Sequence, residues 1–187
     1  MRFFPLVAAL IIFSCNDKKQ TTDDTMPAPP QDTLPNLTIT PGADSVNKLL
    51  AGGPGNWRVV TDERSGWTKD ALEYFVYTQR KINPNYPYIT RGDYNCDGKQ
   101  DVAALVTDTT QTKLVFLYAD GKTDWWSGDM MGAALKNFQK QDFGAMKDEE
   151  EVRVSLGCDA VEAEWFEKAT QVIYFNGKKF QNVWTAD

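Results

Sequence analysis

The sequence predicts an α+β domain in which a mainly antiparallel β-sheet is packed by one or two helices. Most of its second half consists of short apolar segments separated by turn residues, a pattern typical of antiparallel strands. Only one long segment has apolar residues at helical spacing. An Asn-Gly pair at 176–177 separates the last two apolar segments, which indicates a hairpin.

The two expected helices precede most of the strands. Asp44 and Ser45 are suitable caps for a short helix that ends near Leu50, before a Gly-Gly-Pro sequence. Thr68 is the expected cap of a longer helix from Lys69 to about residue 81. Its apolar face is formed by residues at helical spacing, namely Leu72, Phe75 and Val76.

The expected strands are short. Segment 113–118 is apolar on both faces, which indicates a central strand covered on both sides. A two-residue type I′ turn at Asn176-Gly177 places Ile173 opposite Phe180. The other expected strands cover 57–61, 88–90, 102–106, 152–156, 160–166, 171–175 and 178–184.

The N-terminal segment has the features of an export signal. Arg2 precedes an apolar run that is too short for a membrane-spanning helix but has the length of a signal-peptide core. The run ends in Ile-Phe-Ser-Cys at 12–15, which resembles the lipobox of bacterial lipoproteins. This resemblance implies cleavage of a signal peptide at 1–14, lipid on Cys15, and a membrane-anchored protein of the cell envelope. We expect the outer membrane and leave its face open.

A tether is expected between the anchor and the folded domain. Residues 15–42 are rich in Thr, Asp, Pro and Gln and contain no aromatic residue, so they can bury little apolar surface. Three Asp-Ser/Thr-apolar triplets, at 24–26, 32–34 and 44–46, leave O-glycosylation open. Residues 43–187 are then the single globular domain.

One motif has metal-binding chemistry. Residues 93–101 read Asp-Tyr-Asn-Cys-Asp-Gly-Lys-Gln-Asp, with oxygen-bearing side chains at alternate positions and a glycine at the sixth. Calcium prefers six to eight oxygen ligands, and crowded carboxylates repel one another without a cation. The expected ligands are Asp93, Asn95, Asp97, the Lys99 carbonyl and Asp101. Ala104 stands where an EF-hand has its bidentate Glu, so an EF-hand is not predicted.

The motif resembles the calcium loops of FG-GAP/VCBS-type repeats over residues 92–106. In that family the loop joins two strands and binds calcium. A single copy is present, and a propeller needs about four blades or more, so no propeller is expected. From Trp57 to Asp187 the layout also resembles a group of small exported bacterial proteins. That resemblance implies a shared α+β fold and no particular activity.

Two thiols remain once Cys15 carries lipid. Exported proteins meet oxidising conditions, so Cys96 and Cys158 are candidates for a disulfide that ties the loop to a later strand. The alternative is a pair of buried free thiols.

Composition excludes several kinds of chemistry. There is no histidine, which removes His-based catalysis and the usual zinc sites. The net charge is −6, and it becomes −7 once Arg2, the only charge of the signal peptide, is removed. Nucleic-acid binding needs clustered basic residues and is not expected.

Three functions stay open. Trp125 and Trp126, expected on a turn after segment 113–118, are candidate exposed aromatics of a module that binds carbohydrate or an envelope protein, and Tyr86 and Tyr88 form a second such pair. The alternative is a carboxylate-dependent glycoside hydrolase, with Glu162 and Glu164 about 7 Å apart on one strand face. Glu167 is a third candidate, and a structural accessory role is the third function. We expect a binding or structural protein rather than an enzyme.

Overall fold

The computed structural model describes residues 42–185. Contacts divide the chain into Met1–Thr33 and Leu34–Asp187, and all described residues belong to the second unit. The predicted signal peptide, Cys15 and nearly all of the tether lie outside the described residues.

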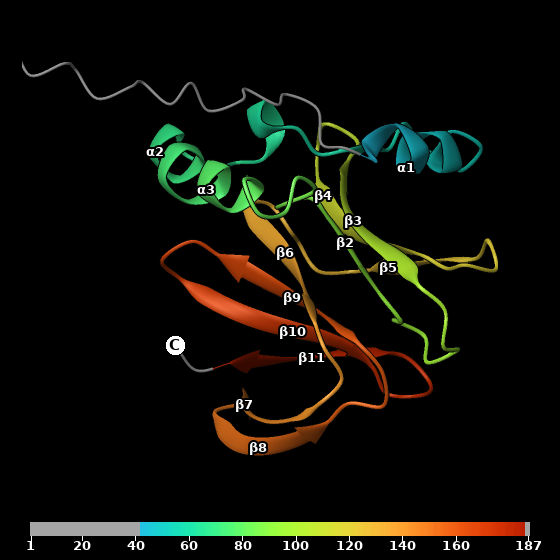
Figure 1. Ribbon diagram of the computed structural model, residues 1–187, viewed down its shortest axis with the longest axis vertical. Coiled ribbons are helices and arrows are strands. Elements are labelled where there is room, and N and C mark those ends of the chain that lie inside the picture. Colours follow the sequence, from blue (N-terminus) through green and yellow to red (C-terminus); the bar gives the residue numbers. More distant parts are fainter. Residues whose placement is uncertain (1–41, 186–187) are drawn as a thin grey trace, which may run out of the picture. The chain divides into compact units, whose positions relative to one another are not determined.

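The first sheet is centred on β3 (Figure 1). Strands β3, β4 and β5 follow one another as antiparallel neighbours. Both β1 and β2 pair with the other edge of β3, where Arg58 faces Thr107 and Ile89 faces Ala104. The bounds are β1 Arg58–Val59, β2 Ile89–Gly92, β3 Asp101–Thr107, β4 Thr112–Leu117 and β5 Thr123–Trp126.

The second sheet is antiparallel throughout, in the order β6-β9-β10-β11-β7-β8. A single residue pair, Trp184 and Met146, joins β11 to β7. The β7–β8 hairpin shares a small apolar cluster with β9, β10 and β11, so it covers one face of its own sheet. The bounds are β6 Ala133–Phe138, β7 Asp142–Lys147, β8 Glu150–Ser155, β9 Ala160–Trp165, β10 Ala169–Phe175 and β11 Phe180–Thr185.

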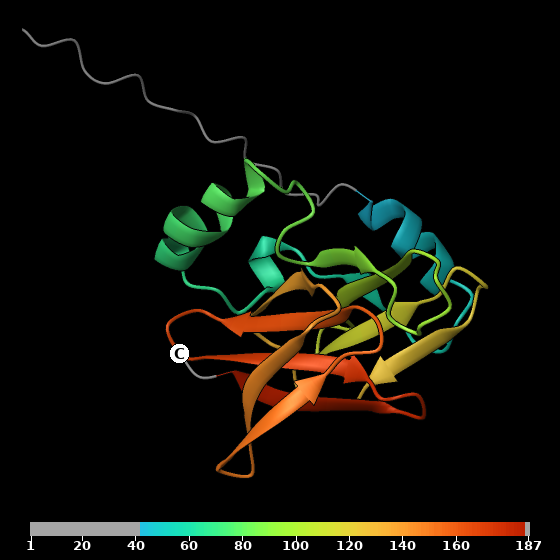
Figure 2. The ribbon, with the colours of Figure 1, turned by 60° about the horizontal axis from the view of Figure 1, so that its bottom comes forward.

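The main core lies between the two sheets. It joins β3 and β4 to apolar residues of β6, β9 and β10, while helix α1 (Ala43–Leu50) covers the first sheet with Val46 and Leu50. Figure 2 shows α1 on the side of the first sheet that faces away from the second. The β4 strand is therefore buried on both faces, as segment 113–118 predicts.

A second helical segment packs on β6. It consists of α2 (Lys69–Ala71), a π-helical turn η2 (Leu72–Val76) and α3 (Tyr77–Arg80), which together match the predicted helix. The Thr68 hydroxyl accepts a hydrogen bond from the Ala71 N–H at 3.2 Å, which is the expected cap. A short 3-10 turn, η1 (Asp62–Arg64), precedes it.

The predicted α+β class, a mainly antiparallel fold packed by short helices, is therefore correct. Several local predictions are wrong. Gly42 is the N-cap of α1, so Asp44 and Ser45 lie inside the helix. The strand expected at 57–61 contains only two residues because it pairs with a short part of β3.

The register of the last hairpin also differs from the prediction. Phe180 faces Phe175, and Ile173 faces Asn182. The Asn176 N–H donates to the Lys179 carbonyl at 3.1 Å, and only Gly177 in this turn has a positive φ. The turn is therefore centred one residue later than a type I′ turn at Asn176-Gly177 requires. The change of two residues in the register leaves each side chain on its predicted face.

Candidate functional site

The loop between β2 and β3 folds around its own acidic side chains. Asp93 accepts hydrogen bonds from the N–H groups of Asp97 (3.1 Å) and Gly98 (3.0 Å). Asn95 accepts from Asp97 N–H at 3.0 Å, and Asp97 accepts from Lys99 N–H at 2.8 Å. Gly98, with φ of 79°, supplies the turn that brings these groups into one bend.

Asp101, the first residue of β3, anchors the loop through its carboxylate. It is 1% exposed, and its two carboxylate oxygens accept from the Tyr94 N–H at 3.0 Å and the Ala119 N–H at 2.9 Å. Burial raises the pKa of Asp101; the two N–H bonds oppose this, and the charges of Asp97 and Asp93 add to it. Three carboxylates therefore influence one another at this loop, and one of them is buried.

The loop fits a hard cation by the chemistry of its donors. Asp93, Asn95, Asp97 and Lys99 come together in one bend, while Asp101 lies behind them, bonded to backbone on both oxygens. Within residues 42–185, no three His, Cys, Asp or Glu side chains are already gathered as metal ligands. Calcium would be held by the predicted ligands Asp93, Asn95, Asp97, the Lys99 carbonyl and Asp101, since each Asp101 oxygen accepts one N–H bond and keeps a second lone pair.

A disulfide joins the loop to the second sheet. Cys96 and Cys158 are bonded, with Cα atoms 5.0 Å apart. Cys96 has φ of 66°, in the left-handed region that favours glycine. The disulfide links two residues that are 62 positions apart in the sequence. It fixes the loop beside the turn between β8 and β9.

Asp159 strengthens the same junction. One of its oxygens accepts from the Asp93 N–H at 3.2 Å and from the Asn137 amide at 3.4 Å, and the other accepts from Lys140 N–H at 3.1 Å. At Gly92 a Cβ would lie 2.4 Å from the Asn137 side-chain oxygen and 2.9 Å from an Asp159 oxygen, so a larger residue would displace these two side chains.

The two candidate tryptophans lie in β5, not on a turn. Trp125 faces Val115 and Trp126 faces Leu114 in the neighbouring strand β4. Trp126 packs partly against the main core, whereas Trp125 is 39% exposed and makes a tilted ring contact with Trp57 at 5.1 Å. Trp126 therefore belongs partly to the core, whereas Trp125 is partly exposed to solvent.

Both tryptophans line a cavity of about 310 Å³ against the β10–β11 hairpin. The Phe180 ring stacks on Phe116 of β4 at 4.0 Å between ring centres, which holds the hairpin beside β5. The remaining lining residues are Asp124, Ser127, Phe175, Lys178, Lys179 and Phe180. The two walls come from residues about fifty positions apart, so the sequence could indicate the aromatic pair but not the hairpin that completes the cavity.

Asp124 has a fixed orientation in this cavity. Its carboxylate accepts a hydrogen bond from the Tyr118 hydroxyl at 2.9 Å. Burial, together with the neighbouring Asp124, raises the pKa of Tyr118, so this hydroxyl stays protonated and continues to donate at neutral pH. The cavity thus combines aromatic faces with one carboxylate and two ammonium groups.

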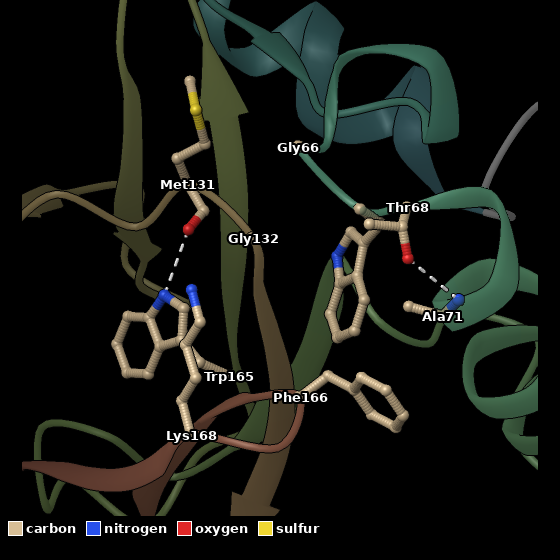
Figure 3. A pocket seen from close by; sticks show the side chains of 9 residues that line it. Gly66, Thr68, Ala71, Met131, Gly132, Trp165, Phe166 and Lys168 are labelled. Carbon is tan, nitrogen blue, oxygen red and sulfur yellow. Dashed lines mark hydrogen bonds between the residues drawn. The ribbon is translucent and has the colours of Figure 1, made fainter.

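A second cavity, of about 390 Å³, lies between the start of α2 and the β9–β10 turn (Figure 3). Figure 3 shows Trp165 and Lys168 on one side of it, Thr68 and Ala71 on the other, and Phe166 below. The Trp165 ring N–H donates to the Met131 carbonyl at 3.0 Å, and Phe166 packs on Phe75 at 5.1 Å. No sequence pattern links the three segments that form it: 66–71, 131–132 and 165–168.

The two glutamates predicted as catalytic carboxylates, Glu162 and Glu164, both lie beside Lys136. Lys136 lies 2.6 Å from Glu164 and 4.0 Å from Glu162. Burial raises the pKa of Glu162, Lys136 lowers it and Glu164 raises it. Glu167 lies in the turn after β9, with a positive φ of 55°. Since both glutamates face the same cation, the arrangement is that of a cross-strand ion pair rather than of two carboxylates on opposite sides of a substrate.

The second predicted aromatic pair, Tyr86 and Tyr88, is buried rather than exposed. Tyr86 is 2% exposed and Tyr88 is 1% exposed. The Tyr88 hydroxyl donates to Asp62 at 2.9 Å, and Asp62 also pairs with the buried Arg80. These tyrosines belong to the core, which leaves the Trp125 cavity as the exposed aromatic site predicted from the sequence.

The fold and this site together define a two-sheet α+β domain with an acidic loop and an aromatic cavity. The chain matches no family model, no curated protein and no solved structure. Within residues 42–185, no helix has the length and apolarity required to cross a membrane.

Proposed function

We propose that this chain is a lipid-anchored cell-envelope protein whose calcium-stabilised domain binds carbohydrate in the Trp125 cavity. The observation that carries the proposal is the exposure of Trp125 at a cavity that Trp126 also lines. Single exposed apolar side chains are normal on a protein surface, so the informative feature is that two neighbouring tryptophans line the same cavity.

The chemistry of the cavity favours a sugar as its ligand. One face of a sugar ring presents C–H groups that pack flat on an indole, while its hydroxyls need hydrogen-bond partners. Trp125 offers the first, and Asp124, Lys178 and Lys179 offer the second. A cavity of about 310 Å³ accommodates one or two rings. A stable protein partner would instead need about 800 Å² of matching surface.

The calcium part of the proposal rests on the acidic loop. Asp93 and Asp97 lie close enough to Asp101 to raise its pKa, and a bound divalent cation would offset that repulsion. The anchor rests on the sequence at 12–15, which resembles a lipobox. Two or three acyl chains at a lipoprotein terminus would give firm attachment.

The experiment compares two exposed tryptophans. Trp125→Ala removes the proposed stacking surface, and Trp184→Ala is a matched control because Trp184 is 42% exposed and lies on β11 outside the cavity lining. A panel of neutral and acidic oligosaccharides is titrated into the mature protein in detergent and followed by calorimetry.

We expect binding of at least one oligosaccharide, with a loss of at least tenfold for Trp125→Ala and less than twofold for Trp184→Ala. Loss of about 1.4 kcal/mol or more of binding energy is the usual effect of truncating a central aromatic contact. Absence of binding to every oligosaccharide, or equal effects of the two substitutions, contradicts the proposal.

A further inference from the structure

The Trp125 surface is flanked by lysines that lack acidic partners. Lys178 and Lys179 line the cavity, and the Lys113 ammonium lies over the Trp57 ring at 5.5 Å. Trp57 in turn contacts Trp125. Within residues 42–185, none of these three lysines lies within ion-pair distance of a carboxylate, whereas Lys122 and Lys136 do.

This concentration of positive charge opposes the charge of the whole chain. The sequence has 26 acidic and 20 basic residues, whereas two lysines and one carboxylate line this cavity. Of the residues that line the cavity, Asp124 is the one acid, and the Tyr118 hydroxyl already occupies one of its oxygens. The rim of the cavity therefore has an excess of positive charge.

We infer that the carbohydrate bound by this cavity is acidic, built from sugar rings that carry carboxylates, such as a uronic acid oligosaccharide. This inference rests on the proposed function and specifies its ligand class. The ring of one sugar unit packs on Trp125, and its carboxylate, or that of the next unit, lies between Lys178 and Lys179. Lys113 lies on the Trp57 side and meets a further acidic unit along the chain.

The position of the lysines supports this assignment over an extended polyanion. Lys178 and Lys179 are held at a turn, because both of their N–H groups donate to the Asn176 side chain at 3.0 Å. These bonds fix the backbone of both lysines at the β10–β11 turn, and both residues line the cavity together with the aromatic side chains. A polyanion recognised only through its charge would not need Trp125 and would meet the acidic remainder of the surface.

The test pairs acidic oligosaccharides with uncharged ones. Oligogalacturonate, oligomannuronate and a glucuronate-containing oligosaccharide are titrated against their carboxyl-reduced counterparts, in 50 mM and 300 mM NaCl, with the mature protein in detergent. The variant is Lys178→Gln/Lys179→Gln, and the control is Lys48→Gln/Lys147→Gln, which changes two exposed lysines on other elements by the same charge.

We expect at least one acidic ligand to bind tenfold or more tightly than its reduced counterpart at low salt. The Lys178→Gln/Lys179→Gln variant should lose that preference, and 300 mM NaCl should reduce it because exposed charges are screened. The control should change affinity by less than twofold. Equal binding of the acidic and reduced ligands, with dependence on Trp125 intact, overturns this inference and leaves the proposed function standing. Binding that is unchanged by Trp125→Ala overturns both this inference and the proposed function.

Discussion

The β2–β3 loop and the Trp125 cavity differ in how firmly the chain holds them. The loop is fixed by Asp101, by the Cys96–Cys158 disulfide and by the contacts of Asp159 with neighbouring segments. The cavity is formed by β5 and the β10–β11 hairpin, and one of its two tryptophans, Trp125, is exposed.

This difference indicates a division of roles. Changes at the loop should alter the free energy of unfolding strongly, because they leave buried groups without partners or release a cross-link. Changes at the cavity should alter ligand affinity while stability stays nearly constant.

Asp101→Ala should cause the largest loss of stability. The substitution leaves the buried N–H of Tyr94 and the partly buried N–H of Ala119 without their acceptor, at a cost of about 2–4 kcal/mol. Asp101→Asn keeps one acceptor and should lose less. Urea unfolding followed by tryptophan fluorescence measures both; equal stability of Asp101→Ala and the parent would refute the anchoring role.

Removal of the disulfide should have the next largest effect. Cys96→Ala/Cys158→Ala releases a link across 62 residues and should cost about 2–4 kcal/mol. Cys96→Gly/Cys158→Ala should recover about 0.5–1 kcal/mol of that loss, because residue 96 has φ of 66° and glycine adopts it readily. Denaturant midpoints of the two double variants measure the difference, and a less stable glycine variant would argue against the backbone explanation.

Trp125→Ala should change stability by less than about 1.5 kcal/mol, although we expect it to abolish most of the proposed carbohydrate binding. The side chain is 39% exposed, so only part of its surface is buried on folding. The same substitution at Trp126, which packs against the main core, should cost more, about 3 kcal/mol. Thermal melts of the two variants in the same buffer test this order, and the reverse order would contradict the assignment of core and surface.

Glu162→Gln should have the smallest effect, visible as a change in pH dependence. Burial raises the pKa of Glu162, so folding favours its protonated form. Its contribution to stability is therefore present below the ordinary pKa of 4.5 and is lost as pH rises through the raised value in the folded state. The glutamine variant should flatten the stability profile above pH 4.5. Glu164→Gln, which removes the 2.6 Å partner of Lys136, is the control and should lower stability at neutral pH. If Glu162→Gln left the dependence of stability on pH unchanged, the raised pKa of Glu162 would be contradicted.

Periodicity predicted the parts of the fold that are uniformly apolar. The β3 and β4 strands and the longer helix have clear patterns, and the structure contains all three. The β5, β6 and β7 strands were not predicted because their sequences mix charged, small and aromatic residues without alternation. They are strands because of their neighbours, as at the single pairing of Trp184 with Met146.

The candidate site shows the same limit. The acidic loop could be recognised because its residues are adjacent in sequence. The cavity could be predicted only in part, since Trp125 and Trp126 were visible as an aromatic pair while Phe175 and Phe180 had the pattern of an ordinary strand end. The role of Asp101 as a buried anchor was also not visible, because its second partner, the Ala119 N–H, lies eighteen residues away.

The central claim is that a divalent cation holds the acidic loop and thereby the domain. Its most direct test is calorimetric melting of the mature protein in detergent, first freed of metal and then supplied with calcium up to 10 mM. With an affinity of about 10⁻⁴–10⁻³ M, typical of extracellular sites, calcium should raise Tm by about 3–10 °C. Asp93→Asn/Asp97→Asn should remove that rise. An unchanged Tm for the parent protein across this range would contradict the account.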